Sequence, residues 1–327
     1  MRVALAIGRT DPLFDPHQPA ASGDSPRPDA YWTSSILRDL QIACPRRGWA
    51  CDIFYIGQTA DQRVARPQVV VNLISEPLIC TTSLALLGQH AQRFGLRVLN
   101  TPTATVRTSR INLPTLAGAV PDTVIPLTTW HRGPASDLET HIRAAHGGRP
   151  VLMRPPGSHG SKGLSKVDLA HDALARFEPA PGGYLVTDFV DFRSADGLYR
   201  KYRMIRIGRQ LFHRHLITAD DWNITGASRT FMVGRPALIE AEKEFLAGGG
   251  GDLEPRISAL FEASGLDFGL IDFAVDRSGR IIVFELNGCF QITRSIPPDK
   301  IARWGHLEAG NGPILEALLD LIAARAV

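Results

Sequence analysis

The sequence has few of the features that mark membrane, secreted or nucleic-acid-binding proteins. Its apolar runs fall short of the ~20 residues that a membrane-spanning helix requires. Residues 1–8 hold only a short apolar run before Arg9 and Asp11, too short for a signal peptide. Aromatic residues make up 7% of the chain, and no basic run alternates with stacking side chains. We therefore expect neither a membrane nor a nucleic acid among its partners.

Cysteine and net charge are also low. The 4 cysteines are scattered and form no Cys-x-x-Cys pair, so reduced thiols in a cytoplasmic protein are the simplest interpretation. Lys and Arg number 36 against 33 Asp and Glu, and the net charge of +3 identifies no partner. At 44% hydrophobic and 21% charged, the composition excludes a disordered tail, a coiled coil or a collagen-like rod. A length of 327 residues favours two domains, or two lobes around a cleft.

The first 100 residues alternate short apolar strands with helical patterns, which is typical of a parallel sheet in an α/β domain. A buried strand is expected at residues 2–7. A polar loop is expected at residues 8–30, because its prolines exclude helix and central strand. The other elements expected here are a helix at 31–43, strands at 51–56 and 69–74, a helix at 84–94 and a strand ending at Leu99.

The rest of the chain has the pattern of strand hairpins and helices. Strands at 150–154 and 164–167 are expected to flank a glycine-rich loop. Gly208-Arg209 is expected to be the tight turn of a second hairpin. The remaining expected elements are strands at 184–190, 199–207, 210–217, 268–275 and 280–285, and helices at 236–246, 253–264 and 313–324.

Acidic side chains interrupt the last predicted hairpin. Asp272 lies inside an apolar strand, Glu285 ends the neighbouring strand, and Asn287 follows two residues later. Alternation places Glu285 and Asn287 on one face, and a turn at 276–279 can bring Asp272 opposite them. Two carboxylates and an amide oxygen suit Mg²⁺. The alternative is that Asp272 is a satisfied core residue and Glu285 a strand-end charge; spacing alone leaves both interpretations open.

Two further features concern anions. The loop from Gly157 to Gly163 holds three glycines, two serines and a lysine between adjacent strands, so its backbone N–H groups can surround an anion. For the loop alone, a mobile surface turn is the favoured interpretation. Lys201 and Arg203 share one strand face, where they would stabilise charge on a transferring phosphoryl group. A solvated strand face is the alternative there.

A pair of histidines lies on the following strand. Alternation places His213 and His215 on one shared face, where they would be able to bind a metal. Zinc sites usually add cysteine or further histidine ligands, and neither type lies nearby in the sequence. The pair is therefore a weak zinc signal.

Taken in order, these features resemble the ATP-grasp superfamily, whose members include glutathione synthetase, D-alanine–D-alanine ligase and ribosomal-protein glutamate ligases. The resemblance covers about residues 97–295. Residues 97–102 and then Ser109-Arg110 resemble the family's Asn-x-Pro segment and the basic residue that contacts nucleotide phosphates. Arg154 stands where the family usually has a lysine for the α- and β-phosphates. Residues 199–222 also resemble a poorly described ATP-grasp subgroup, which suggests no particular substrate.

The resemblance implies roles for the other motifs. The 157–163 loop resembles the lid over the phosphates, and residues 187–190 resemble the hinge whose backbone reads adenine. Leu270 stands where D-alanine–D-alanine ligases have a catalytic arginine, which makes that branch less favoured. The implied catalytic residues are Arg203, facing the γ-phosphate, and Arg294, stabilising a tetrahedral intermediate. The implied metal ligands are Asp272, Glu285 and Asn287, and the implied nucleotide-binding residues are Arg110, Arg154, Gly157, Ser158, His159, Gly160, Ser161, Lys162, Gly163, Asp188, Phe189, Val190 and Lys201.

The implied fold is α/β, of the α+β ATP-grasp type. An N-terminal parallel-sheet α/β domain at residues 1–100 precedes two ATP-grasp lobes that enclose the nucleotide. The smaller lobe, at 101–186, carries the glycine-rich lid, and the C-terminal lobe, at 187–327, carries the metal site.

The implied function is an ATP-dependent carboxylate–amine ligase that works through an acylphosphate and releases ADP and phosphate. Its cofactors would be ATP and Mg²⁺, with Mn²⁺ as an alternative ion. Its partners would be a small carboxylate and an amine, such as amino acids or a peptide, and a homodimer is left open. The alternatives are a small-molecule kinase of the same fold and a non-catalytic nucleotide-binding regulatory protein.

Overall fold

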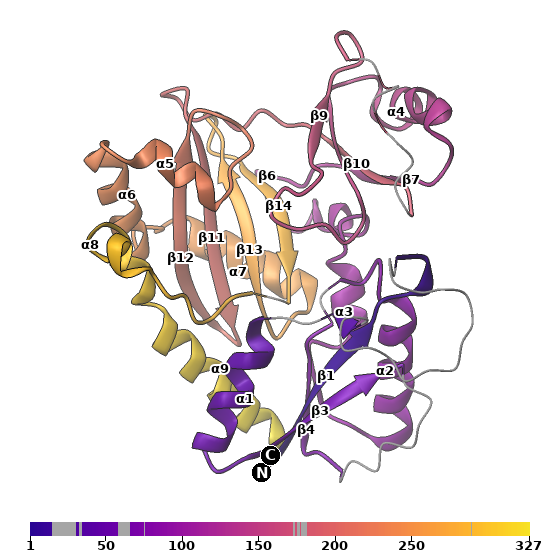
Figure 1. Cartoon of the computed structure of the whole chain (residues 1–327), viewed down its shortest axis with the longest axis vertical. Helices are drawn as coiled ribbons and strands as arrows, with labels where there is room; N and C mark the ends of the chain where they lie inside the picture. The colour runs from indigo at the N-terminus through magenta and orange to yellow at the C-terminus, as the bar shows by residue number, and fades with distance from the viewer. Residues whose placement is uncertain are drawn as a thin grey trace.

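The computed structural model describes residues 1–14, 31–32, 35–57, 66–74, 76–172, 174, 177, 182–288 and 290–327. Three sheets organise the chain (Figure 1): one in the N-terminal part, one in a small lobe and one in a large lobe. The two ends of the chain lie close together, beside the N-terminal sheet (Figure 1). No helix in the described ranges is long and apolar enough to cross a membrane.

The N-terminal sheet is built around strand β1 (Arg2–Arg9), with β3 (Ala50–Ile56) and β4 (Val69–Asn72) parallel to it on either side. β5 (Val98–Leu99) extends it in parallel beyond β4, and β2 (Tyr31–Trp32) pairs antiparallel with the end of β1. Helices α1 (Ser35–Arg46) and α2 (Thr81–Phe94) pack against this sheet. Strands covered on both faces have apolar interiors, as β1 has between Arg2 and Arg9 and β4 has before Asn72, and the predicted parallel sheet is confirmed.

Two expected boundaries in this region were wrong. Gly8 and Arg9 belong to β1 rather than to a loop, because Trp32 and Tyr31 pair with them. The helix expected from residue 31 begins at Ser35, after that short strand. Most of the expected 8–30 loop, residues 15–30, lies outside the described residues.

The small lobe is an antiparallel sheet in the order β7-β10-β8-β9, with helix α4 (Leu138–His146) packed against it. β8 and β9 form the predicted hairpin around the glycine-rich loop, with Met153 opposite Ser165. The strands of this lobe are β7 (Thr128–His131), β8 (Val151–Arg154), β9 (Ser165–Val167) and β10 (Tyr184–Asp188).

The large lobe contains a sheet in the order β12-β11-β13-β14-β6, whose first four strands are antiparallel. β6 (Thr123–Val124) reaches in from the small-lobe segment and pairs in parallel with β14. Helices α6 (Pro236–Leu246) and α7 (Leu253–Ser264) pack against this sheet, over the residues expected for them. The four antiparallel strands are β11 (Tyr199–Ile207), β12 (Gln210–Ala219), β13 (Phe268–Val275) and β14 (Ile281–Asn287).

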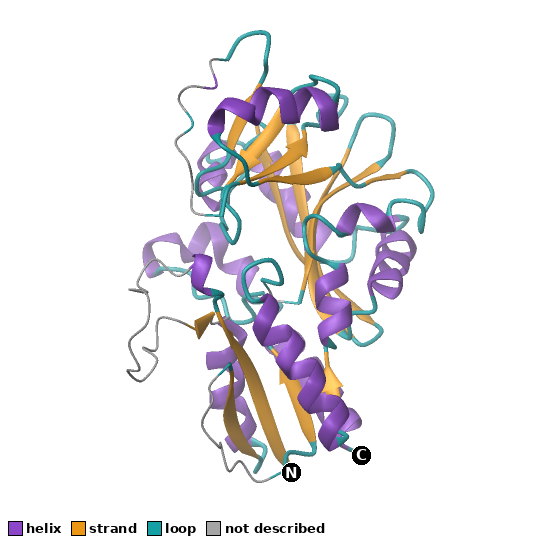
Figure 2. Ribbon diagram, turned by 90° about the vertical axis from the view of Figure 1, so that its right-hand side faces the viewer, coloured by secondary structure: helices purple, strands orange, loops and turns teal. Residues whose placement is uncertain are grey.

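The C-terminal helix joins the first and last parts of the chain. Helix α9 (Asn311–Ala326) lies beside the N-terminal sheet (Figure 2) and contacts both β4 and β11. One apolar cluster contains Val71 of β4, Ile205 of β11 and Leu318 of α9, all fully buried. The large-lobe sheet and the N-terminal sheet therefore share a hydrophobic core. The shorter helices of the described chain are α3 (Pro102–Arg107), α5 (Arg229–Met232) and α8 (Ile301–Trp304).

Asn100 fixes the junction between β5 and the large lobe. Its side-chain oxygen accepts hydrogen bonds from the backbone N–H groups of Asp267 and Phe268, at 2.8 and 3.1 Å. Its amide nitrogen donates to the carbonyl of Phe268 at 2.9 Å. The residue is 1% exposed and has a φ of 56°, a left-handed conformation that asparagine adopts more readily than most residues.

We predict that Asn100→Ala lowers the free energy of unfolding by about 2–4 kcal/mol, because it leaves buried backbone groups without partners. Urea denaturation followed by circular dichroism measures this change. Gln92→Ala, on the exposed face of α2, is the control and should change stability by less than about 0.5 kcal/mol. Equal effects of the two substitutions would contradict the assigned role of Asn100.

Candidate active site

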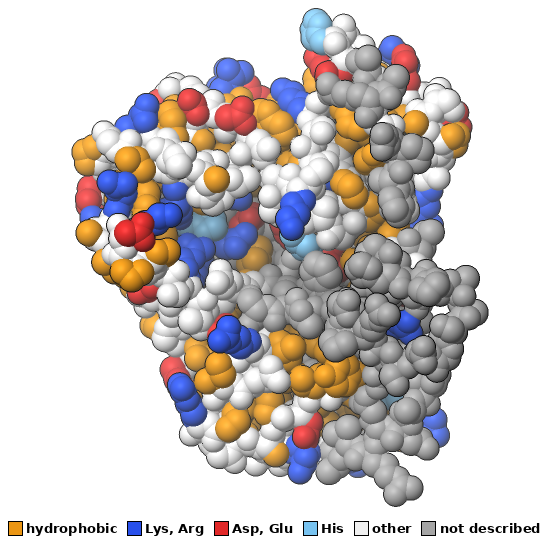
Figure 3. All heavy atoms as spheres, in the orientation of Figure 1, with side chains coloured by type: hydrophobic (Ala, Val, Ile, Leu, Met, Phe, Trp, Pro, Cys, Tyr) orange, Lys and Arg blue, Asp and Glu red, His pale blue; other side chains and the backbone are white. Residues whose placement is uncertain are grey.

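A cavity of about 770 Å³ lies between the small lobe and the large-lobe sheet. Figure 3 shows basic, acidic and histidine side chains gathered in the hollow over the large lobe. A cavity of this size, with convergent polar groups, is typical of a small-molecule site. Of the sequence-predicted site residues, those that line it are Arg110, Arg154, His159, Gly160, Ser161, Lys201, Arg203, Asp272, Glu285, Asn287 and Arg294.

The floor of the cavity carries a row of side chains from adjacent strands. Arg203 of β11 is opposite Asp272 of β13, and Asp272 is opposite Glu285 of β14. His215 of β12 is opposite Arg203, so the row spans four strands. Register irregularities follow Arg203 and Asp272 in these pairings. Such bulges re-aim side chains and are common beside active sites.

Arg203 and Asp272 form a two-point ion pair. Nε of Arg203 donates to one carboxylate oxygen at 2.6 Å, and Nη2 donates to the other at 2.7 Å. Nζ of Lys201 lies 3.8 Å from the same carboxylate and donates to the carbonyl of Ile224 at 2.9 Å. Asp272 is 5% exposed and lies in an apolar strand, where a charge is tolerated only when it is paired. The cations of Arg203 and Lys201 provide that pairing. This contact confirms that Lys201 and Arg203 share the cavity face.

Glu285 is held by side chains from three directions. An Nη2 donor of Arg110 lies 3.2 Å from one carboxylate oxygen, and the amide of Asn287 donates to the other at 2.7 Å. His159 Nδ1 lies 4.0 Å from that second oxygen. Burial alone would raise the pKa of Glu285, but Arg110, His159 and other nearby cations outweigh it and lower the pKa to about 2. The carboxylate is therefore ionised and available as an oxygen ligand at neutral pH.

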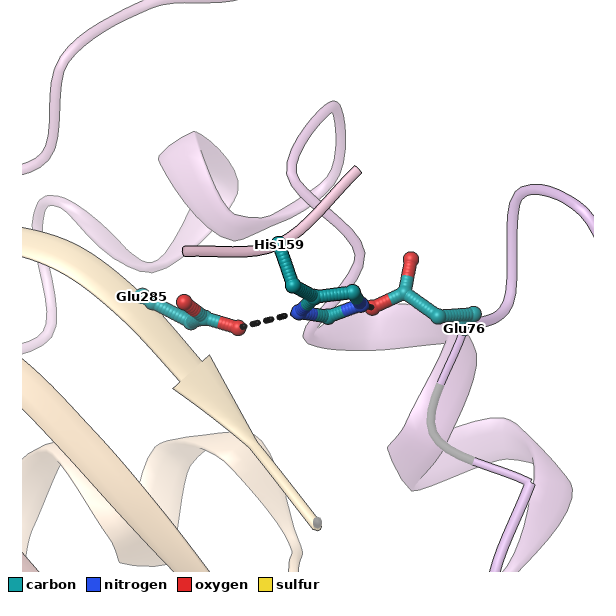
Figure 4. A group of neighbouring side chains, drawn as sticks. All are labelled: Glu76, His159 and Glu285. Atoms are coloured by element: carbon teal, nitrogen blue, oxygen red, sulfur yellow. Dashed lines mark ion pairs between the residues drawn. The ribbon is translucent and has the colours of Figure 1, made fainter. Parts of the chain in front are cut away.

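The glycine-rich loop reaches across the cavity through His159. The imidazole lies between two carboxylates (Figure 4), with Nε2 at 2.7 Å from Glu76 and Nδ1 near Glu285. Burial lowers the pKa of His159, but the hydrogen bond and charge of Glu76, together with Glu285, raise it overall above its ordinary value. Glu76 follows strand β4, so His159 links the loop to the N-terminal domain as well as to the large lobe.

The loop also holds Arg154 at the end of β8. Its guanidinium donates to the Oγ of Ser158 at 3.0 Å and to the carbonyl of the same residue. Burial and then repulsion from Arg110 lower the pKa of Arg154 to about 10, so it stays charged at neutral pH. Gly157 has a φ of 69°, and a Cβ there would lie 2.6 Å from Ile79. The left-handed backbone at this position, packed against Ile79 of the N-terminal domain, favours glycine at the start of the loop.

Several sequence-predicted residues lie outside the cavity lining, namely Gly157, Ser158, Lys162, Gly163, Asp188, Phe189 and Val190. The side chain of Asp188 pairs instead with His146 at 2.8 Å and Arg149 at 3.1 Å. Thr187 lines the cavity, because successive residues of β10 face opposite sides of the small-lobe sheet. The N–H groups of Asp188 and Phe189 donate to the carbonyls of Leu127 and Pro150.

The expectation that His213 and His215 share a face was wrong. Arg203 pairs with His215 and Met204 pairs with His213, so Arg214 is an extra residue in β12. His215 consequently lines the cavity, whereas His213 packs its ring against Phe245 at 4.6 Å between centroids. Period-two alternation fails wherever a strand contains a bulge. The two histidines therefore form no shared metal site.

Sequence reasoning missed several residues that line the cavity, and it missed Glu76, which lies beside the cavity. Glu76 follows the carboxyl end of a parallel strand, which is where ligands bind in such sheets, and that position was an available signal. Arg229 lines the cavity and pairs with the buried Glu242 at 2.6 Å. Nothing in the sequence links Arg229 to residues 285–294, because only the tertiary fold brings them together. Other lining residues that were not predicted include Thr128, Leu152, Phe192, Asn223, Lys300 and Trp304.

The donor set on the cavity floor fits a divalent cation. Asp272, Glu285 and Asn287 offer two carboxylates and an amide oxygen, the ligand types that Mg²⁺ prefers. Potential ligand atoms of Glu76, His159 and Glu285 also lie within 4.8 Å of one another. Asp272 does not belong to that group, and Arg203 donates to both of its oxygens.

The fold has relatives among solved structures, although no family model and no curated protein matches the sequence. PsnB, an ATP-grasp ligase, is 14% identical over 98% of this chain and 97% of its own, with a TM-score of 0.52. The D-alanine–D-alanine ligase of Bacillus anthracis is 11% identical over 100% of this chain and 97% of its own, with a TM-score of 0.51. The chain has the ATP-grasp fold.

The ATP-grasp fold extends over the whole chain. A RimK-domain ATP-grasp protein from Sphaerobacter thermophilus is 17% identical over 99% of this chain and 100% of its own, with a TM-score of 0.50. The α/β class and the ATP-grasp resemblance predicted from sequence are therefore confirmed at the level of fold. At identities of 11–17%, these relatives establish the ATP-grasp architecture and leave the reaction to be argued from this chain's own residues.

Asp276 closes the turn between β13 and β14, the two strands that carry Asp272 and Glu285. Its carboxylate accepts hydrogen bonds from the backbone N–H groups of Ser278 and Arg280, at 2.9 and 3.0 Å. Burial raises the pKa of Asp276, but hydrogen bonds from Ser278 and Arg280 outweigh it and lower the pKa to about 2. A lowered pKa means that the carboxylate stabilises the fold only while it is ionised.

We predict that Asp276→Asn lowers the free energy of unfolding by about 1–3 kcal/mol at pH 7. The stabilisation by Asp276 is fully present above about pH 4 and is lost as the pH falls through 2, so the variant and the wild type should converge in acid. Denaturation at several pH values measures this difference. The exposed Asp220→Asn is the control, and a difference independent of pH would contradict the assignment.

Proposed function

We propose that this protein is an ATP-dependent ligase that joins a carboxylate to an amine. The observation that carries the proposal is the row of Arg203, Asp272 and Glu285 on the cavity floor, facing a glycine-rich loop that begins beside Arg154. Cations for phosphate oxygens and oxygen ligands for a metal thus share one cavity. This combination is what phosphoryl transfer from ATP requires.

Nucleotide phosphates would lie between the two lobes. Arg154 lines the cavity from β8 of the small lobe, Arg110 lines it beside Glu285 of β14, and His159, Gly160 and Ser161 of the loop line it as well. The adenine would enter between Leu152, Thr187 and Phe192, next to the hinge at residues 187–190. Since Asp188 and Phe189 already donate their N–H groups within the protein, adenine recognition would use the remaining backbone groups of the hinge.

Asp272, Glu285 and Asn287 would hold Mg²⁺. The ion would neutralise the β- and γ-phosphates as charge develops during transfer. Within the described chain, the two carboxylates are paired with Arg203 and Arg110. The guanidiniums of Arg203 and Arg110 would offset the charge of the phosphate oxygens, which are the acceptors that arginine forks suit best.

The chemistry would have two steps. A carboxylate oxygen of the substrate attacks the γ-phosphorus, the bond from that phosphorus to the bridging oxygen breaks, and ADP leaves with the bond's electron pair. The amine nitrogen then attacks the acylphosphate carbon, loses a proton, and inorganic phosphate leaves as the amide forms. Arg203 and Lys201 would offset charge during the first step, and Arg294 would stabilise the tetrahedral intermediate of the second.

The loop at residues 157–163 would act as a lid that protects the acylphosphate from water. His159 already bridges from this loop to Glu76 and Glu285. Closing of the lid would therefore involve the N-terminal domain and the large lobe as well as the small lobe. Such contacts would couple the position of the lid to occupancy of the metal site.

The structural relatives support a ligase reaction with amino-acid or peptide substrates. PsnB has been solved in complex with a minimal precursor, Mg and ADP, and another relative of this fold is a D-alanine–D-alanine ligase. For this chain, we propose small carboxylates and amines, among them amino acids or peptides, as the substrate class.

The direct test incubates the purified protein with ATP, Mg²⁺ and pools of carboxylates and amines, and follows ADP release and amide products by mass spectrometry. Amide formation that requires both pools is the expected result. ADP release with a carboxylate alone and a stable phosphorylated product would instead identify a kinase. ATP binding without turnover in any pool would identify a nucleotide-binding regulatory protein.

We expect Glu285→Gln to reduce turnover about 100-fold or more, because it removes an ionised metal ligand. Circular dichroism should show an intact fold, because the amide can keep its contact with Asn287. Glu254→Gln, on the exposed surface of α7, is the matched control and should leave turnover unchanged. Unchanged activity of Glu285→Gln would rule out the metal assignment.

Arg154→Lys tests the phosphate contact. We expect it to keep most activity, with a modest rise in the KM for ATP, because the charge is retained while the second contact of the planar fork is lost. Arg154→Met should raise the KM for ATP about tenfold or more. Steady-state kinetics over a range of ATP concentrations measures both effects. Identical kinetics of the two variants would show that charge at this position is irrelevant.

A further inference from the structure

The row on the cavity floor has two chemically different ends. Glu285 and Asp272 occupy one end, beside the glycine-rich loop, and His215 occupies the other. Three strand spacings of about 4.8 Å separate the ends, or about 14 Å in total. Residues 222–226, Arg229 and residues 294–297, from the chain after β12 and after β14, also line the cavity. The triphosphate's metal ligands and His215 are thus too far apart to hold the same group.

His215 is a buried side chain without a hydrogen-bond partner in the described part of the protein. It is 4% exposed, lines the cavity, and has no partner for either ring nitrogen. Burial, and then the nearby cations Arg203, Lys201, Arg229 and Arg294, hold the pKa of this imidazole well below its usual value. A neutral imidazole offers one donor and one acceptor. Leaving both unused in a buried position is costly, so these atoms are suited to a ligand.

The surroundings of His215 carry more positive than negative charge. Arg294 lines the cavity, and burial, followed by repulsion from Arg214, Arg229 and Arg203, lowers its pKa to about 10. The carboxylate that acts on it, Glu242, is already paired at two points with Arg229.

Buried Arg214 adds to this excess from behind the cavity wall. It donates to the carbonyls of Leu307 and Ile292 and to the Oδ1 of Asn311, all of them neutral acceptors. Asn311 also holds the backbone of Arg294, accepting from its N–H at 3.1 Å and donating to its carbonyl at 2.7 Å. The guanidinium of Arg294 therefore extends from a fixed backbone into a corner where, among the described residues, the carboxylate that acts on it, Glu242, is already paired with Arg229.

We propose that the corner formed by His215, Arg229 and Arg294 binds a second anionic group of the substrate, in addition to the carboxylate that is activated. The substrate class is then a dicarboxylate or a phosphorylated carboxylic acid. Because His215 lies one strand spacing from Arg203, about 4.8 Å, a spacer of about two to four atoms would connect the two groups. This inference rests on the proposed function, since it takes the reacting carboxylate to lie beside Arg203.

Arg294 has enough donors for both of its proposed roles. A guanidinium carries five N–H groups, so it can contact the acyl centre and the neighbouring anionic group together. His215 would donate one N–H to the second group. Arg229, held by Glu242 and lying 5.1 Å from the Trp304 ring, would supply a fixed charge at the edge of the corner.

The first test compares matched acids as substrates of the full-length protein with ATP, Mg²⁺ and an amine pool. Succinate is compared with butyrate, and 3-phosphoglycerate with glycerate. We expect kcat/KM to favour the dianionic member of at least one pair by about tenfold or more. The pair in which the dianion is preferred shows whether the second group is a carboxylate or a phosphate. Equal kcat/KM within both pairs would overturn the proposal.

Variants then locate the preference. Arg294→Gln and His215→Gln should each reduce the ratio of kcat/KM values for dianion and monoanion about tenfold, and Arg294→Lys should retain part of it. His213→Gln is the matched control, because this histidine lies in the same strand but packs against Phe245. The assignment would be overturned if His213→Gln lowered the ratio of kcat/KM values as much as His215→Gln does. It would also be overturned if Arg294→Gln left that ratio unchanged.

A binding experiment separates failure of this inference from failure of the proposed function. Isothermal titration measures binding of the preferred acid, or of succinate and 3-phosphoglycerate if no acid is turned over, with Mg²⁺ and a non-hydrolysable ATP analogue present. Absence of turnover with every acid would reject the ligase, whereas saturable binding that Arg294→Gln weakens about tenfold would still support the anion site. Dianion binding that displaces the ATP analogue would place the acid in the phosphate site and overturn the inference.

Discussion

The ion pair between Arg203 and Asp272 is the interaction on which the rest of the site depends. A carboxylate inside an apolar strand is tolerable only when it is paired, and Arg203 meets both of its oxygens from the adjacent strand. The pair fixes the register of β11 against β13, and β13 in turn sets Glu285 of β14 opposite Asp272. His215 is aligned by the same register from the other side. One paired charge thus organises a row that has acidic and basic ends.

The near-neutral net charge of the chain conceals this polarity. Lys201 and Arg203 offset Asp272, and Arg110 offsets Glu285, so the site contributes little to the sum. A ligand that carries both a metal and phosphates would give the carboxylates a cation and the arginines an anion to pair with. No buried charge would then be left uncompensated when the ion pairs within the protein separate. The corner around Arg294 differs, because neutral acceptors hold the neighbouring Arg214 and the carboxylate that acts on Arg294, Glu242, is already paired with Arg229. That local excess is the physical basis for a substrate with a second negative charge.

Interactions between regions, rather than within them, position the lid. His159 belongs to the small lobe, Glu76 to the N-terminal domain and Glu285 to the large lobe, and the imidazole joins the two carboxylates (Figure 4). Asn100 and helix α9 connect the same domain to the large lobe at the far side. The N-terminal domain therefore borders the candidate site through Glu76 and supports the large lobe.

The sequence by itself determined the strands and helices of the large lobe, because their apolar periodicities and glycine turns are local. Alternation along the sequence also predicted that Glu285 and Asn287 share a face, whereas the register irregularity after Asp272 decided that Asp272 lies opposite Glu285. Only the tertiary structure decided which residues meet across long separations, such as Glu76 with His159 or Arg229 with Glu242. It also separated His213 from His215, because the extra residue in β12 follows from pairing with a neighbouring strand. Local patterns fix which way a side chain alternates, whereas packing between distant segments fixes what that side chain meets.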